Sequence, residues 1–166
     1  MPVAQAQTLI TNANIAAAAT AWATNPTTAA TTYGNITDWN TAAVSNMVGL
    51  IGDKPNFNAD IGKWNVASVS NMGSMFQSAT AFNANIGSWN VARVSNMLTL
   101  LYSTTFSADI GAWNVASVST MGSMFHGVTT FNGNIGAWNT ARVSTIARVR
   151  PLFSSVAFMC GVWTVL

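Results

Sequence analysis

Residues 57–81 read FNADIGKWNVASVSNMGSMFQSATA, and four other segments of the chain repeat this pattern. Self-similarity at a period of about 25 residues is typical of repeat proteins, in which each unit packs against its neighbours. The five units span residues 33–155, and Gly161 and Trp163 mark the degraded start of a sixth. One tryptophan recurs in every unit, at Trp39, Trp64, Trp89, Trp113 and Trp138.

Each unit has two halves with different apolar spacing. The first half reads I-x-x-W-x-V, and β-branched and aromatic residues in this pattern favour a short strand. The second half follows the spacing i, i+3, i+6, i+7, which predicts one face of a two-turn helix with a serine N-cap. In residues 69–76 these positions are Val69, Met72, Met75 and Phe76. The sequence therefore predicts a leucine-rich-repeat-like α/β solenoid of about five strand–helix coils of 25 residues with parallel strands.

The N-terminal segment is predicted to close one end of this array, because a solenoid without a cap exposes its core to water. Residues 1–32 form the predicted helical cap. Its helix covers residues 11–24, begins at Thr11 or Asn12, and carries apolar residues at spacings of three and four. The Asn25-Pro26 pair is expected to end it.

The C-terminal segment is predicted to be either a degraded partial repeat or an apolar end, over residues 156–166. The apolar run of residues 151–166 is shorter than the ~20 residues that a membrane-spanning helix needs. Membrane contact, self-association and partner binding through this run stay alternatives to its packing as a cap.

The tryptophan column admits two interpretations, an aromatic face for sugars or a packed core. Packing is favoured, because each Trp is in phase with the Ile and Val of the same half-unit. An asparagine follows every Trp, and its amide can bond backbone groups of the adjacent coil. This predicted structural asparagine ladder comprises Asn40, Asn65, Asn90, Asn114 and Asn139.

A second column of Asn and Asp raises the question of a metal. Hard cations need several carboxylates around one site, and this column has only two, so turn formation is the favoured interpretation. The methionines lie at core spacing without His or Cys partners, which argues against a soft-metal site. No cofactor and no metal are expected. The column comprises Asn35, Asp60, Asn85, Asp109 and Asn134.

Charge is scarce, with six Lys or Arg and four Asp in 166 residues. Without a basic stripe, the net charge of +2 does not indicate nucleic-acid binding. His126 and Cys160 are the only residues of their types, and no nucleophile or acid–base partner can be assigned to either. The sequence therefore predicts a protein that is not an enzyme.

Two columns are predicted to point outward, and both are mostly small and polar. They contain the candidate binding residues Lys63, Arg93 and Arg142. The first column precedes each Trp and comprises Asp38, Lys63, Ser88, Ala112 and Ala137. The second comprises Ala43, Ser68, Arg93, Ser117 and Arg142.

The motif W-N-V-A-S-V-S-N-M-G-S-M-F, followed by F-N-A-N-I-G-S-W-N-V, resembles the repeat of BspA-type leucine-rich-repeat surface proteins. The same repeat is described in mycoplasma lipoproteins of unknown function and in algal and other protist proteins. The resemblance covers residues 33 to about 147 and implies a surface-exposed repeat domain, often credited with adhesion, without catalytic residues. It favours a cell-surface or secreted location, although the N-terminus lacks the basic start and leucine-rich core of a signal peptide.

Three functions remain after these exclusions. The first is a surface-type binding or adhesion module with a protein or glycan partner, because solenoids present long surfaces of equivalent positions. The second is a passive structural spacer or a fragment of a larger repeat protein. The third, remote alternative is an ice-binding solenoid, which the absence of a recurring T-x-T pattern argues against.

Overall fold

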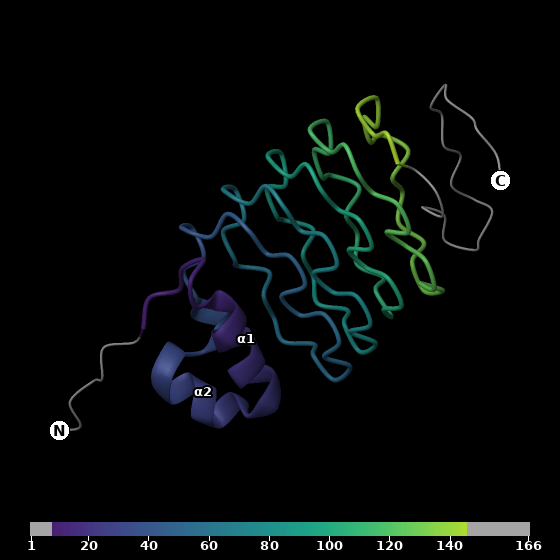
Figure 1. The fold of residues 1–166 in the computed structure, drawn as a ribbon. Helices are drawn as coiled ribbons and strands as arrows, with labels where there is room; N and C mark the ends of the chain where they lie inside the picture. Colours follow the sequence, from purple (N-terminus) through teal and green to yellow (C-terminus); the bar gives the residue numbers. More distant parts are fainter. Residues whose placement is uncertain (1–7, 146–166) are drawn as a thin grey trace.

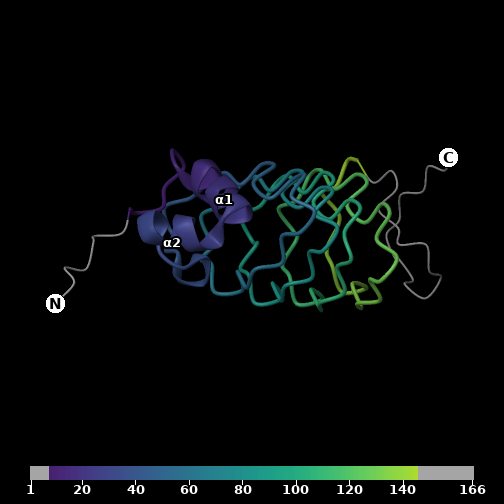
Figure 2. The ribbon, with the colours of Figure 1, turned by 90° about the horizontal axis from the view of Figure 1, so that it is seen from below.

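The structure is a computed structural model that describes residues 8–145. Figure 1 shows a rod in which successive units form successive coils, with two helices at the N-terminal end, and Figure 2 shows the stack from below. The described chain is mostly irregular. Its named elements are α1 (Ile15–Thr24), α2 (Pro26–Tyr33) and the short 3-10 helix η1 (Ile36–Asp38). The predictions for Cys160 and for residues 151–166 lie outside the described residues.

The first half of each coil consists of two tight turns, which corrects the predicted strand. In the unit of residues 57–81, the Trp64 N–H donates to the Ile61 carbonyl at 3.0 Å, and the Val69 N–H donates to the Val66 carbonyl at 2.9 Å. An Asp or Asn precedes each turn and accepts a hydrogen bond from the N–H two residues later. Such Asx residues favour turns because their side chains replace a backbone acceptor, and here they outweigh the β-branched residues.

The second half of each coil is not the predicted helix either. The Met75 N–H donates to the Met72 carbonyl at 3.2 Å, which closes an i→i+3 turn. The N–H groups of Met72 and Ser74 donate to the carbonyls of Asn96 and Leu98 in the next coil, at 2.9 and 2.8 Å. An α-helix would direct each N–H to its own carbonyl four residues back. The φ of Ser74 is 55°, which an α-helix also excludes.

Neighbouring coils are joined along one line by backbone and serine hydrogen bonds. The predicted parallel sheet is reduced to one isolated parallel bridge per coil, connecting Asn46, Asn71, Asn96, Thr120 and Thr145 in turn. Beside these bridges, the N–H and the Oγ of Ser70 both donate to the Ser45 carbonyl, at 2.9 and 3.3 Å. The serines predicted as helix N-caps therefore connect coils. The same double donation recurs at Ser95, Ser119 and Ser144.

Aromatic side chains fill the interior of the rod in columns that run from coil to coil. Phe82 stacks on Phe106 with ring centroids 6.0 Å apart, and Phe106 stacks on Phe131 at 6.1 Å. Trp39 and Trp64 stack at 5.8 Å. Each buried ring removes roughly 150–250 Å² from water. The apolar spacing in the sequence thus identifies buried residues, such as Val69, Met72, Met75 and Phe76, although the local structure is not helical.

The two helices cover the aromatic interior at the N-terminal end of the rod. α1 buries Ile15, Ala18 and Ala19. Trp22 of α1 meets Trp39 edge to face at 6.3 Å. Tyr33 at the end of α2 approaches the same Trp39 ring at 6.2 Å. The ring at the start of the tryptophan column is therefore shielded by aromatic contacts from the helices.

The second helix, α2, is a difference from the sequence analysis, which places a single helix in the cap and ends it at the Asn25-Pro26 pair. The Asn25 side chain accepts a hydrogen bond from the Thr28 N–H at 3.1 Å, as an N-cap does. Pro26 occupies the first turn, where its missing N–H costs nothing and its fixed φ suits a helix. The Asn25-Pro26 pair therefore separates two helices, and the predicted helix over 11–24 begins at Ile15.

Asn12 provides the hydrogen bonds that a preceding coil would otherwise supply. Its Oδ1 accepts from the N–H groups of Ser45 and Asn46, at 2.9 and 3.2 Å, and its Nδ2 donates to the Ser45 Oγ at 2.9 Å. Asn12 therefore accepts a hydrogen bond from the Ser45 N–H, as the Ser45 carbonyl does from the Ser70 N–H in the next coil. This contact anchors the N-terminal segment to the first coil.

We expect Asn12→Ala to destabilise the first coil by about 1 kcal/mol, the typical net value of a hydrogen bond. Amide hydrogen exchange measured by NMR should speed up at Ser45 and Asn46 and remain unchanged at Ser95. Asn56→Ala, a change at an exposed asparagine of the same coil, serves as the control. Unchanged exchange at Ser45 would show that Asn12 does not anchor the coil.

Candidate binding surface

The predicted tryptophan column lies inside the rod, with each ring between 3 and 8 % exposed. A ring buried to this extent cannot stack on a sugar, which removes the aromatic binding face. Trp39 donates its indole N–H to the Gly34 carbonyl of its own coil at 3.2 Å. Each later indole joins two coils by donating to an isoleucine carbonyl of the preceding coil. The donor–acceptor pairs are Trp64 to Ile36 at 2.8 Å and, at 3.2 Å, Trp89 to Ile61, Trp113 to Ile86 and Trp138 to Ile110.

The asparagine column does not make the predicted bonds to the adjacent coil through its side-chain oxygens. The Asn65 Oδ1 accepts from the Ala67 N–H of its own coil at 3.1 Å, and the Asn90 Oδ1 accepts from Ala92 at 3.2 Å. An Asx turn uses the nearest backbone N–H, so the amide oxygen is occupied locally. The same contact occurs at Asn40, Asn114 and Asn139.

The second Asx column also stabilises turns. Asp60 and Asp109 accept from the N–H groups of Gly62 and Gly111, at 3.0 and 2.8 Å. Asn85 stands between the two carboxylates in the column and makes the same contact with Gly87. Among residues 8–145, no group of three or more His, Cys, Asp or Glu side chains lies together in a way that could hold a metal.

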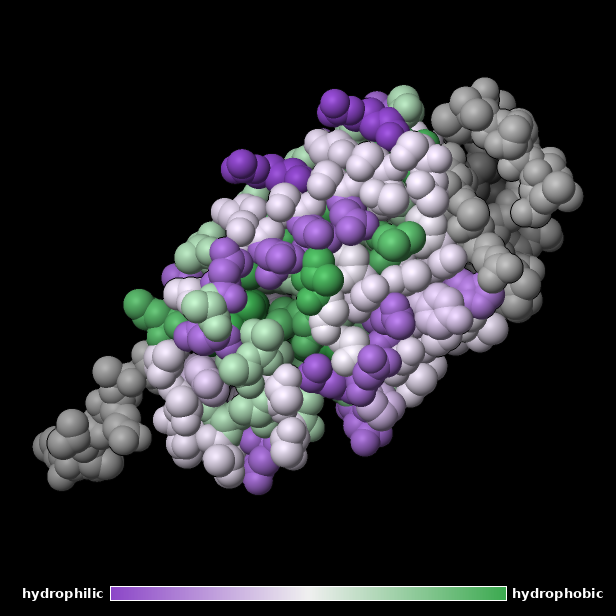
Figure 3. Space-filling model, viewed as in Figure 1, coloured by the Kyte–Doolittle hydropathy of each residue, from purple (hydrophilic) through white to green (hydrophobic). Residues whose placement is uncertain are grey.

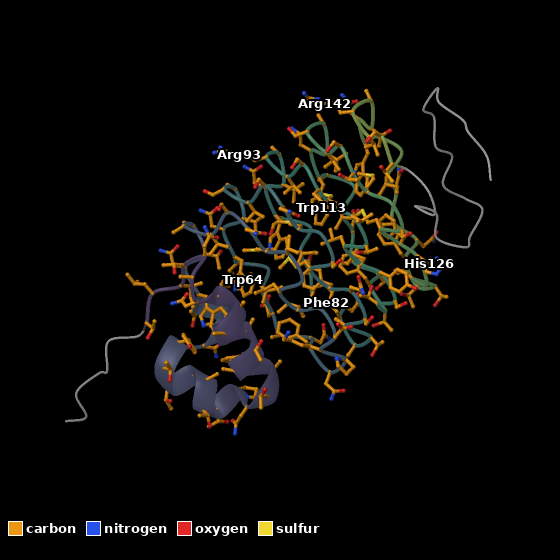
Figure 4. All side chains as sticks on the ribbon, viewed as in Figure 1. Trp64, Phe82, Arg93, Trp113, His126 and Arg142 are labelled. Carbon is orange, nitrogen blue, oxygen red and sulfur yellow. The ribbon has the colours of Figure 1, made fainter. Side chains whose placement is uncertain are left out.

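The candidate binding residues lie in two different turns of the coil. Lys63 belongs to the turn that ends at a tryptophan, whereas Arg93 and Arg142 belong to the turn that follows it. All three side chains are exposed. Figure 4 shows Arg93 and Arg142 projecting from the same long edge of the rod, with His126 at the opposite edge. The structure therefore aligns the two arginines and assigns Lys63 to the other outward column.

A feature that the sequence analysis missed is an open groove of about 440 Å³ between the third and fourth units. Its lining offers one amide, one hydroxyl and one carboxylate, so it can hydrogen-bond a polar ligand. Asp109 is its one titratable group, which provides no acid–base pair for catalysis. The same pattern of Asx, Gly and Ala recurs in the neighbouring units, so it does not single out this groove. The groove is lined by Asn85, Gly87, Ser88, Ala108, Asp109 and Ala112.

A second hollow, of about 350 Å³, lies between α1 and the return loop of the first coil. Thr20 and Thr24 of α1 face Asp53, Lys54 and the loop that leads to the buried Phe57. This hollow is lined by mixed polar and apolar groups. Nothing in it pairs a nucleophile with a base, so its chemistry is limited to hydrogen bonding and charge attraction.

His126 lies in the second half of its coil. Its ring stacks on Tyr102 of the preceding coil, with centroids 4.9 Å apart, and it is half-buried. The contact places His126 among the residues that join neighbouring coils. The space-filling view in Figure 3 shows a mostly pale to polar face over the coils, with hydrophobic residues in small patches.

Within the part of the chain that the structure describes, no helix has the length and apolar character needed to cross a membrane. No curated protein and no solved structure matches the chain in the comparisons. The family model described as Mycoplasma protein of unknown function, DUF285, matches residues 19–106 and again residues 100–156. These consecutive matches cover most of the sequence, so the chain belongs to the DUF285 family.

Proposed function

We propose that this chain is a non-enzymatic binding module of the surface type, which holds a protein or glycan partner on the exposed columns of its rod. The observation that carries the proposal is that the side chains that hold the coils together differ from those that face the solvent. The side chains that join the coils are buried or bonded to neighbours, as the tryptophan indoles are. The outward positions of the turns are free to vary without loss of core packing, and they recur in register along the rod.

The hydrogen bonding of the buried polar groups supports a binding role over catalysis. Every buried side-chain nitrogen or oxygen of the described residues has a hydrogen-bond partner. Catalytic acids and bases are titratable groups, and the buried polar residues of the described chain are the threonines Thr41, Thr104 and Thr140. The resemblance to BspA-type leucine-rich-repeat surface proteins extends the proposal to adhesion at a cell surface, with the rod as the exposed part.

The proposal is tested by biolayer interferometry of the immobilised full chain against a panel of polysaccharides and extracellular proteins. We expect at least one partner to bind. Two blocking variants then locate the face, because Ser88→Trp fills the groove and Ser117→Trp covers the arginine column. One of them should weaken binding by about ten-fold or more, equal to ~1.4 kcal/mol. Thr105→Trp, at an exposed return loop, should leave binding unchanged.

Absence of binding to every member of the panel, by a chain that retains its circular dichroism spectrum, would contradict the proposal and favour the passive spacer. Equal loss of binding in all three tryptophan variants would also contradict it. That result would indicate non-specific adsorption, because the three positions lie in different parts of the coil.

A further inference from the structure

Two columns of the rod alternate from coil to coil between the second and fifth units, although the core repeats every coil. Arg93 and Arg142 occupy equivalent positions in the third and fifth units, and Ser68 and Ser117 occupy that position in the second and fourth. The Asx column alternates in the same way. Its carboxylates, Asp60 and Asp109, are in the second and fourth units, and Asn85 and Asn134 are in the third and fifth.

This alternation sets the distance between the two arginines. They are separated by one intervening coil, which carries Ser117 at the equivalent position. Parallel strands lie about 4.8 Å apart in a ladder, and the coils are joined by parallel bridges. Two coils therefore place the backbones of Arg93 and Arg142 roughly 10 Å apart along the axis. Figure 4 shows both side chains projecting from one edge.

From the second unit onward, the acidic residues belong to different turns of the coil from Arg93 and Arg142. In these units, the segment that begins at each Trp and contains the turns after it has no Asp or Glu. Asp60 and Asp109 lie before the Trp of their units. Neither Arg93 nor Arg142 forms a hydrogen bond or an ion pair with another described residue. No described residue therefore competes with an external anion for either guanidinium group. The acid-free segments are 64–78, 89–103, 113–127 and 138–145.

The residues beside the arginines are exposed and uncharged. We define the arginine edge as Arg93 and Arg142 together with two exposed residues from each of the third to fifth units, the asparagine that follows the Trp and the serine five residues after that asparagine. These are Asn90, Asn114, Asn139, Ser95, Ser119 and Ser144. An arginine guanidinium binds a carboxylate through two parallel hydrogen bonds, and amides and hydroxyls suit a ligand rich in hydroxyl groups.

We infer that the arginine edge binds a linear carboxylated glycan that lies along the rod. An extended uronate chain with a two-fold screw presents carboxylates on one side at every second sugar, which suits one arginine in every second coil. The sugar hydroxyls then face the asparagines and serines between the arginines. This inference rests on the proposed binding function and specifies its ligand.

Other macromolecules fit this edge less well. Duplex DNA carries one charge per about 1.7 Å and is held by many cations at once, whereas the edge offers two. A protein partner usually needs a buried aromatic or apolar anchor. Among the described residues, the large hydrophobic side chains with substantial exposure are Leu9, Val48 and Leu98, none of which belongs to the edge.

The test measures binding of the full chain to polygalacturonate by isothermal titration calorimetry, with the fully methyl-esterified polymer as the neutral control. We expect the acid form to bind and the ester not to bind. Arg93→Ala with Arg142→Ala should weaken binding by about ten-fold or more, because exposed ion pairs contribute modestly and two are lost. Asp60→Asn should not weaken it, because this carboxylate belongs to the turn that ends at Trp64 and not to a turn that carries an arginine.

The spacing is tested by a variant with unchanged net charge. Arg142→Ser combined with Ser117→Arg moves one arginine to the neighbouring coil, in a position where the fold already accepts arginine. We expect this variant to bind as weakly as Arg142→Ser alone. Wild-type affinity in the relocated variant would overturn the inference, because attraction to net charge would then be sufficient. Thermal unfolding by circular dichroism checks that the variants are folded.

The remaining outcomes separate the inference from the proposed function. Equal binding of polygalacturonate and poly(U) RNA would overturn the inference, since it would indicate a general polyanion response. Binding of the methyl ester or of a protein ligand, without binding of the acid polymer, would overturn the inference and leave the binding module intact. Failure to bind any of these and any partner in the wider panel would contradict both.

Discussion

Trp89→Ala is expected to lower the free energy of unfolding by about 3–5 kcal/mol, the range for large-to-alanine changes at buried aromatic positions. The Trp89 ring is 4 % exposed and lies 6.2 Å from the Phe76 ring of the preceding coil. Its truncation leaves a cavity in the middle of the stack. It also leaves the Ile61 carbonyl without the indole N–H that donates to it at 3.2 Å. Urea denaturation followed by circular dichroism measures the loss.

Two controls separate the contributions to this loss. Trp89→Phe retains an aromatic ring but removes the indole N–H, and we expect it to destabilise the chain by about 1–2 kcal/mol through the smaller ring and the lost bond. Arg93→Ala, in the same coil, should cost under about 0.5 kcal/mol, because exposed substitutions rarely cost more. Equal losses for Trp89→Ala and Arg93→Ala would contradict the assignment of inside and outside columns.

The sequence was sufficient to predict the period, the buried positions and a helix near the N-terminus, because burial imposes a repeating apolar pattern. It was not sufficient to predict the local structure. The apolar spacing from Val69 to Phe76 suits a helix. Successive i→i+3 turns, however, also place residues that are three positions apart in the sequence on the same side of the chain. Ser74 adopts a positive φ that its identity does not indicate. Its N–H donates to Leu98, a residue too distant in sequence for a local pattern to reveal.

The strand prediction failed for a different reason. It gave more weight to Ile61, Trp64 and Val66 than to the turn-forming Asp60. It also assigned Asn65 to a ladder between coils, whereas the side chains of both Asp60 and Asn65 close turns. The outward residues Arg93 and Arg142 were predictable from their phase relative to tryptophan. The groove between the third and fourth units was not predictable, because it depends on how closely two coils approach and not on any one residue type.

Gly87→Ala tests that close approach and is expected to destabilise the chain by about 2–3 kcal/mol, as overpacking typically does. A Cβ at this position would lie well inside van der Waals contact of the Asp109 backbone carbonyl oxygen in the next coil. A backbone atom cannot rotate away as a side chain can, so the two coils must separate. Ser88→Ala, one residue later and exposed, should change stability by less than about 0.5 kcal/mol.

Separation of the coils has a second measurable consequence. Trp113 in the next coil donates its indole N–H to the Ile86 carbonyl, beside Gly87, at 3.2 Å. The glycine lets the coils approach closely enough for this bond. Gly87→Ala should therefore speed hydrogen exchange at the Trp113 indole, measured by NMR, more than at the Trp64 indole two coils away. Equal exchange at both indoles, with full stability, would show that the coil spacing does not depend on glycine at this position.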